Sequence, residues 1–194
     1  MIRSLAQSIT VCMEIIIHHF EVIDSTNCWA LKNLKAFDSH HLTLVTADEQ
    51  TAARGQYGRS WYAPKFMNLY ASFVFFINEK TRPPLIWTRL LAHIVLHVIE
   101  KMGIKGVIKE PNDIFVNGKK IAGILSETSP RENGYWIVIG LGLNVNMPRE
   151  ECKKIDQPAT SLLCETQKKW MITSIRNDIV TEFLYRFDSN ADEK

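Results

Sequence analysis

The sequence lacks several features that mark specialised classes of protein. No apolar run approaches the roughly 20 residues needed to span a membrane. The formal net charge is only +2, which argues against a nucleic-acid binder that relies on bulk charge and leaves any anion site local. The cysteines, Cys12, Cys28, Cys152 and Cys164, form no CxxC pair and no zinc spacing. We therefore expect a cytoplasmic protein with reduced thiols and without nucleic-acid or membrane partners.

Motifs of several enzyme classes are missing as well. The sequence has no GxxxxGK[ST] phosphate loop, and the GxG at 140–142 lacks the third glycine of a dinucleotide fingerprint. No GxSxG elbow supports a Ser-His-Asp hydrolase. His93 and His97 have the spacing of metal ligands, but no glutamate follows His93 and both fall on the polar face of their helix. No dedicated metal cage is predicted.

What the sequence does contain is the patterning of one globular domain. Hydrophobic residues make up 46% of the 194 residues, enough for a substantial core. Strands are predicted at 14–23, 41–47, 69–77, 106–110, 114–116, 119–126 and 135–145, and helices from DSTN at 24–27 to about 37, from 82 to 102 and from 172 to 187. The segment 147–158 reads as polar and irregular. This mixture predicts a single α/β or α+β layer domain at 14–188, with 1–13 as an ill-ordered extension, Met13 as an alternative start, and 189–194 as a polar tail.

The strand predicted at 135–145 has two unequal faces. Successive side chains of a strand point to opposite sides, so one face, from Tyr135 to Val145, is entirely apolar. The other face carries Gly140 and Gly142 and ends in Asn144. Glycine inside a strand often marks the close approach of a ligand or of another backbone. This face predicts either a binding floor or, as the alternative, a crossing helix packed on the glycines.

A hairpin is predicted around the turn Asn117-Gly118. In a regular ladder Phe115 faces Lys120 and Asp113 faces Ala122, so Asp113 and Lys120 share a face as diagonal neighbours, roughly 7–8 Å apart at the backbone. That separation is too large for an automatic salt bridge, and both charges point into one space. The alternative is a solvent-facing charge pair. Lys119 is expected on the opposite face.

The stretch ARGQYGRSW at 53–61 lies in a polar loop that has neither helix nor strand periodicity. Long loops of this kind are usually functional or disordered. Arginine offers a planar fork to phosphate or carboxylate, and glycines allow backbone N–H groups to close around an anion. The loop therefore predicts an anion site with an aromatic wall, and the alternative is a solvated loop with incidental arginines.

Five stretches together resemble one known family. DSTN at 24–27, ADEQTAARGQYGRSW at 47–61, KEPND at 109–113, GKKIAGILSE at 118–127 and GLGLNVN at 140–146 are similar to the catalytic domain of biotin protein ligases, in the family's order and at similar spacing. The similarity runs from about 14 to 187. It implies a fold like the class II aminoacyl-tRNA synthetase core, a mixed, largely antiparallel sheet with helices on one side. It also implies ATP-dependent activation of biotin to biotinyl-5′-AMP, then transfer to a lysine of a biotin carboxyl carrier protein.

The resemblance also implies roles for single residues. Biotin-binding roles fall on Ser25, Thr26, Gln50, Arg54, Gly123, Gly140 and Gly142. Nucleotide-binding roles fall on Arg54, Arg59, Trp61, Asn112, Lys120 and Asn144, and catalytic roles on Lys120, Asp113 and Arg54. Lys120 would contact the biotin carboxyl oxygen and the α-phosphate, and Asp113 would orient groups there or help to place Mg²⁺. Magnesium would be held mainly by phosphate oxygens and water.

The chain departs from the family pattern at several positions. The loop usually reads GRGRRGRxW, and here Gln56 and Tyr57 replace two of its arginines. KWPND has become KEPND, with Glu110 in place of the tryptophan. We expect neither the SH3-like barrel that usually follows this domain nor a helix-turn-helix before it. The alternatives are a lipoate- or octanoate-transferring relative, whose RRxxGGG loop is absent, and a non-catalytic biotin-binding regulatory module. The family's habit of pairing through its sheets favours a homodimer.

Overall fold

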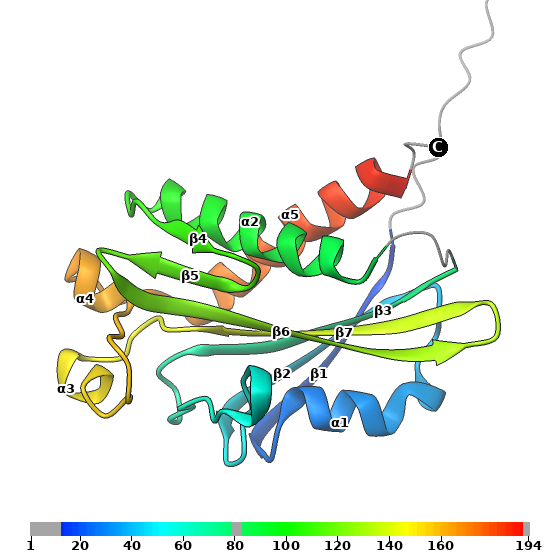
Figure 1. Cartoon of the computed structure of the whole chain (residues 1–194), viewed down its shortest axis with the longest axis horizontal. Coiled ribbons are helices and arrows are strands. Elements are labelled where there is room, and N and C mark those ends of the chain that lie inside the picture. Colours follow the sequence, from blue (N-terminus) through cyan, green and yellow to red (C-terminus); the bar gives the residue numbers. More distant parts are fainter. Residues whose placement is uncertain (1–12, 79–82, 192–194) are drawn as a thin grey trace, which may run out of the picture.

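One mixed sheet of seven strands divides the molecule into two faces (Figure 1). The computed structural model describes residues 13–78 and 83–191, so most of the predicted extension at 1–13 and the end of the predicted tail lie outside the described residues. The strands are β1 (Ile15–Ile23), β2 (Leu42–Gln50), β3 (Leu69–Ile77), β4 (Val107–Lys109), β5 (Asp113–Val116), β6 (Lys119–Arg131) and β7 (Gly134–Leu143). Their order is β1-β2-β3-β7-β6-β5-β4, and among these described strands only β1 and β2 pair in parallel. The predicted mixed, largely antiparallel sheet is confirmed.

The two long helices cover one face of the sheet (Figure 1). They are α2 (Leu85–Lys101) and α5 (Ile172–Ala191), and α5 extends past its predicted end into the predicted tail. The apolar face of β7 is buried beneath them, as its alternation predicts. Phe183 of α5 is fully buried, with its ring 5.0 Å from that of Phe73 on β3. This layer contains most of the hydrophobic core.

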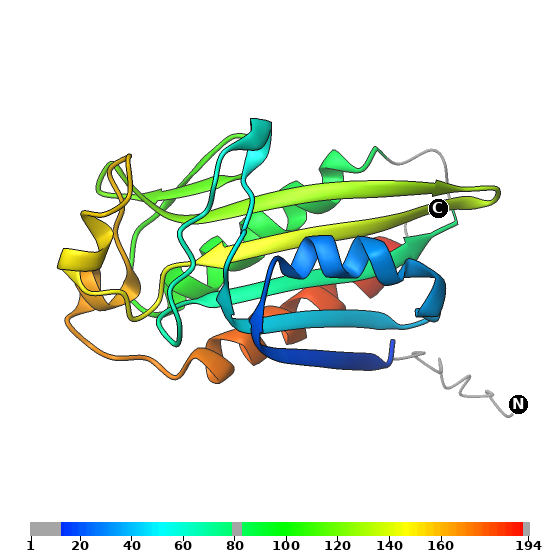
Figure 2. The ribbon, with the colours of Figure 1, turned by 90° about the horizontal axis from the view of Figure 1, so that it is seen from below.

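The opposite face carries α1 (Thr26–Asn33) and the 53–61 loop (Figure 2). Ser25 caps α1 by accepting a hydrogen bond from the backbone N–H of Cys28, at 3.4 Å. Ala30 and Leu34 pack on Val45 and Val138 of the sheet. The expectation of helices on one side therefore holds for α2 and α5, whereas α1 connects the parallel strands β1 and β2 across the other face.

The β5–β6 hairpin contains a one-residue irregularity that the sequence does not announce. Phe115 pairs with Lys120 as predicted, but Asp113 pairs with Gly123 instead of Ala122, because the register shifts between Ile114 and Phe115. The prediction of Asp113 opposite Ala122 was wrong. The extra residue in β6 allows Lys120 and Gly123, three positions apart, to share one face.

The segment predicted as irregular contains one short helix and is followed by another. α3 (Arg149–Cys152) interrupts it, and α4 (Leu162–Thr166) follows it. Both helices are too short to produce a periodic apolar pattern. Ser161 caps α4 through the N–H of Cys164, at 3.1 Å. Across the described residues, the helices are all too short or too polar to cross a membrane.

Candidate functional site

A cavity that is partly open to solvent lies on the face of the sheet that carries α1. The 53–61 loop forms one wall, the start of α1 another, and β6 and β7 the floor (Figure 2). Its lining comprises Ser25, Thr26, Asn27, Gln50, Ala53, Arg54, Gly55, Gln56, Arg59, Ser60, Trp61, Asn112, Asp113, Lys120, Gly123, Ile124, Leu125, Gly140, Leu141, Gly142 and Gln157. The structure therefore brings together every predicted site residue except Asn144.

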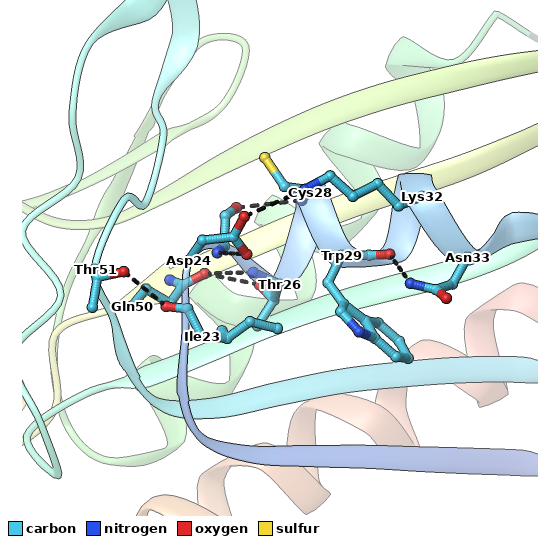
Figure 3. A network of polar contacts seen from close by, with 10 residues as sticks. Ile23, Asp24, Thr26, Cys28, Trp29, Lys32, Asn33, Gln50 and Thr51 are labelled. Carbon is cyan, nitrogen blue, oxygen red and sulfur yellow. Dashed lines mark hydrogen bonds and ion pairs between the residues drawn. The ribbon is translucent and has the colours of Figure 1, made fainter.

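A hydrogen-bond network orders one end of the cavity. Oε1 of Gln50 accepts from the backbone N–H of Thr26 at 2.8 Å and from its hydroxyl at 3.1 Å (Figure 3). Ser72 of β3 lies behind them, with its hydroxyl 2.8 Å from Thr26 Oγ1. Because the Gln50 oxygen is committed to Thr26, its amide nitrogen is the end that can donate to a ligand. The capping hydroxyl of Ser25 accepts from α1 and keeps its proton for donation.

The glycines of the floor lie under two different side chains. A Cβ at Gly140 would overlap with the Asn27 amide from α1, so the crossing-helix alternative is correct at this position. A Cβ at Gly142 would lie 2.5 Å from the Trp61 ring, and one at Gly123 would lie 2.8 Å from it. The loop, not a helix, therefore covers those two glycines. Trp61 Nε1 is buried and has no hydrogen-bond partner among the described residues.

Lys120 and Asp113 meet at the floor. Lys120 Nζ lies 2.7 Å from Asp113 Oδ1, so the prediction that they are too far apart for a salt bridge was wrong. The side chains are only 11% and 18% exposed. The contact is an ion pair between two largely buried groups that both line the cavity. Lys119 is exposed and does not line the cavity.

The backbone on either side of Lys120 is fixed by a neighbouring segment. Its N–H donates to the carbonyl of Pro158 at 2.8 Å, and its carbonyl accepts from Thr160 N at 2.9 Å. The ammonium stands 5.3 Å above the Trp61 ring. Asn144 is buried at the base of the same segment and donates to the Thr160 carbonyl, at 2.9 Å. In this structure Asn144 supports the segment that holds Lys120.

The loop closes on itself as a small hairpin. Arg54 and Ser60 form an isolated bridge, and Gly55 N–H donates to Arg59 carbonyl at 2.7 Å. At its tip Tyr57 has φ 58° and is 92% exposed. A left-handed backbone is uncommon for a residue with a side chain of this size, and such conformations cluster at ligand clamps. The loop is an ordered structure in the described protein.

No role was predicted from the sequence for Asn27 and Gln157, which line the cavity, or for Glu127, which lies beside it. Asn27 and Glu127 stand inside the quoted stretches DSTN and GKKIAGILSE, but neither received a role there. Glu127 pairs with Arg54 and Asn27 from β6. Gln157 comes from the segment that had no periodic signal. Glu110 lies away from the cavity and pairs with Arg89 of α2, at 3.0 Å.

Comparison with known proteins decides the family. The model of the biotin/lipoate A/B protein ligase family matches residues 19–144. The chain belongs to this family. The match includes every predicted site residue, from Ser25 to Asn144.

Its relatives include proteins named as biotin ligases. The chain is 32% identical over 167 residues to the bifunctional ligase/repressor BirA of Salmonella typhimurium, covering 85% of this chain and 50% of that protein. It thus spans about half the length of the curated relatives it matches. The biotin protein ligase from Aquifex aeolicus in complex with biotin and ATP superposes with a TM-score of 0.71, at 29% identity, covering 89% of this chain and 72% of that one. The Leishmania major enzyme in complex with biotinyl-5-AMP gives 0.67 at 28% identity, covering 90% and 75%.

Proposed function

We propose that this chain is an ATP-dependent biotin–protein ligase. In the first step the biotin carboxylate attacks the α-phosphorus of ATP, which breaks the bond to pyrophosphate and gives biotinyl-5′-AMP. In the second step the amine of a lysine on a biotin carboxyl carrier protein attacks the acyl carbon, and AMP leaves. The observation that carries this proposal is a lysine–carboxylate pair, 2.7 Å apart, beside a side-chain-free floor in one cavity.

The polar end of the cavity suits the ureido ring of biotin. The Gln50 amide nitrogen and the Ser25 hydroxyl are donors, and they would face the ureido oxygen. Thr26 fixes the orientation of Gln50 through two hydrogen bonds, at 2.8 and 3.1 Å. The ring system would lie against the floor formed by Gly140, Gly142 and Gly123, and the Trp61 ring, which covers Gly142 and Gly123 in this structure, would have to shift to admit it. A site built on hydrogen bonds to a substrate strongly rejects analogues that lack those groups.

Lys120 is placed to stabilise the charge of the first step. Its ammonium would contact the biotin carboxyl oxygen and the α-phosphate, where negative charge develops. A fixed charge in a partly buried site acts strongly there, because little solvent screens it. Asp113 keeps the ammonium paired before the ligand arrives, since an uncompensated buried charge is costly. Arg59 and Trp61 also line the cavity and would face the nucleotide.

Magnesium would bind at this site together with the nucleotide and not in a separate protein cage. Asp113 contributes the only carboxylate that lines the cavity of the described chain, and no cluster of three or more His, Cys, Asp or Glu side chains suited to a metal ion occurs in those residues. Asp113 would hold Mg²⁺ together with phosphate oxygens and water. The ion would supply neutralisation of phosphate charge. The 53–61 loop would cover the adenylate and shield this reactive mixed anhydride from water.

Pyrophosphate release tests the proposal. The purified chain is mixed with ATP, Mg²⁺ and either biotin, lipoate or octanoate, and release is followed with and without a carrier domain. We expect release with biotin alone, and a biotinylated carrier lysine by mass spectrometry. Release with lipoate or octanoate only would assign the chain to the other branch of its family. Biotin binding without release would make it a regulatory module.

A further inference from the structure

The side chain of Glu127 joins two walls of the cavity. Its Oε1 lies 3.1 Å from Arg54 Nη2 of the loop, and its Oε2 accepts from Asn27 Nδ2 of α1 at 2.9 Å. Gly123, Leu125 and Glu127 alternate along β6, so all three point to the cavity face. The Glu127 carboxylate therefore links the 53–61 loop to α1 through β6.

Asn27 connects Glu127 to the polar end of the cavity through hydrogen bonds. Its Nδ2 has two acceptors, Glu127 Oε2 and the carbonyl of Leu125 at 3.1 Å, so the orientation of its amide is fixed. Its Oδ1 accepts from the Ser72 hydroxyl at 2.6 Å. Ser72 in turn contacts Thr26, the residue that orients Gln50. A continuous chain of hydrogen bonds therefore runs from Arg54 in the loop to Gln50, whose amide would bind the ligand.

The same contact occupies the Arg54 guanidinium. Arg54 stands at the base of the loop hairpin, bridged to Ser60, and next to Ala53, whose carbonyl accepts from Trp61 N–H at 3.0 Å. A guanidinium paired with a carboxylate offers little net charge to a phosphate. Its side chain is 48% exposed and that of Glu127 is 26% exposed, so solvent weakens the ion pair but leaves its geometry.

We propose that Glu127 is a positioning residue that anchors the loop through Arg54 and sets the hydrogen-bond order of the biotin pocket through Asn27. The Arg54 side chain then acts as the loop's anchor and not as a phosphate ligand. This inference rests on the proposed function for its kinetic consequences, but its structural consequence does not depend on any ligand. The phosphate contact predicted for the loop would then be made by Arg59 instead of Arg54.

Hydrogen exchange of the free protein tests the structural part. Glu127→Gln cannot accept from both Arg54 and Asn27, because its amide nitrogen is itself a donor. We expect amides 53–61 to exchange about three- to tenfold faster in Glu127→Gln, in Arg54→Gln and, without further increase, in the double variant. Glu132→Gln, the same change at the exposed β6–β7 turn, serves as the control and should exchange like the wild type. Equal exchange of the loop in all forms overturns the anchoring role.

Steady-state kinetics test the functional part. In Glu127→Gln and in Arg54→Gln the KM for biotin should rise about tenfold, equivalent to about 1.4 kcal/mol, while kcat at saturating biotin and the KM for ATP change little. An increase in the KM for ATP in Arg54→Gln alone would show a direct phosphate contact and overturn the proposal. A wild type that releases no pyrophosphate with biotin refutes the ligase function instead, and the exchange experiment still decides the role of Glu127.

Discussion

Lys120 combines two properties that a surface lysine lacks. Its side chain is 11% exposed, and its backbone is held on both sides by the Pro158–Thr160 segment. Its neighbour Lys119 carries the same charge on an exposed side chain outside the cavity. Lys120 and Lys119 therefore form a matched comparison, because they are the same residue type and differ in whether the side chain lines the cavity.

Replacing Lys120 with alanine should remove the charge aimed at the α-phosphate. Loss of one such group typically lowers kcat by about 10²–10³, or roughly 3–4 kcal/mol. Lys119→Ala should cost little, and both rates are measured by pyrophosphate release under single-turnover conditions. Similar losses in the two variants would contradict the assignment of Lys120 to the cavity face.

Gln56 is the loop residue that replaces an arginine of the family pattern. It lines the cavity, and its carbonyl accepts from Arg59 Nε at 3.2 Å. Gln56→Arg should add a charge-assisted hydrogen bond to the adenylate phosphate, and such bonds are roughly twice as strong as neutral ones. We expect biotinyl-AMP to dissociate about tenfold more slowly, because affinity changes of this kind appear mostly in the release rate.

Adenylate dissociation is measured for both forms at one salt concentration, since phosphate contacts are screened. The wild type, holding the adenylate loosely, should also biotinylate bystander lysines when the carrier is scarce. Equal release rates would show that Arg54, Arg59 or Tyr57 already closes the loop.

At the scale of elements, the site depends on two strands that lack side chains where they meet the loop. Gly123 of β6 pairs with Gly142 of β7, and both lie under Trp61. Tertiary contact, not turn geometry, is what requires glycine here. The absence of side chains at Gly123 and Gly142 therefore allows the Trp61 ring to approach the strand backbones closely.

Gly142→Ala should fill part of this floor. The added Cβ would lie 2.5 Å from the Trp61 ring, so the ring has to move. We expect the KM for biotin to rise by at least about tenfold and the melting temperature to fall, because the packed Trp61 ring is displaced. Thermal unfolding and biotin titration on the same preparation separate the two effects. An unchanged KM would show that biotin does not lie on Gly142.

The elements also show how far the sequence could be interpreted. Alternation along β7 identified its core face and its bare face, and DSTN located the start of α1. The extra residue in β6 was not predictable, because a bulge depends on how two strands fit together and not on the residues of one. The ion pair of Lys120 was missed for the same reason. Helices as short as α3 and α4 have no period to detect.

At the scale of the whole molecule, the sheet separates the core from the site. The α2–α5 layer contains most of the buried apolar side chains, and the cavity lies on the other side with α1. Phe183→Leu, a change in the first layer, should lower the free energy of unfolding by about 0.5–3 kcal/mol. Urea midpoints measure this loss. The KM for biotin should stay within about twofold, since distant sites act independently. A large change in KM would show that the two layers are coupled.

The alternation of β7 has a consequence for anyone who wishes to give this protein a new substrate. Gly140 and Gly142 lie on the cavity face of β7, whereas the side chains of Ile139 and Leu141, one position away, belong to the hydrophobic core. Substitutions at the cavity-facing positions would therefore change the shape of the pocket and leave the side chains of the α2–α5 core in place. Stabilising changes made first in the α2–α5 layer would widen the range of pocket variants that survive. The alternation of side chains along β7 thus separates the positions that shape the pocket from the positions that pack in the core.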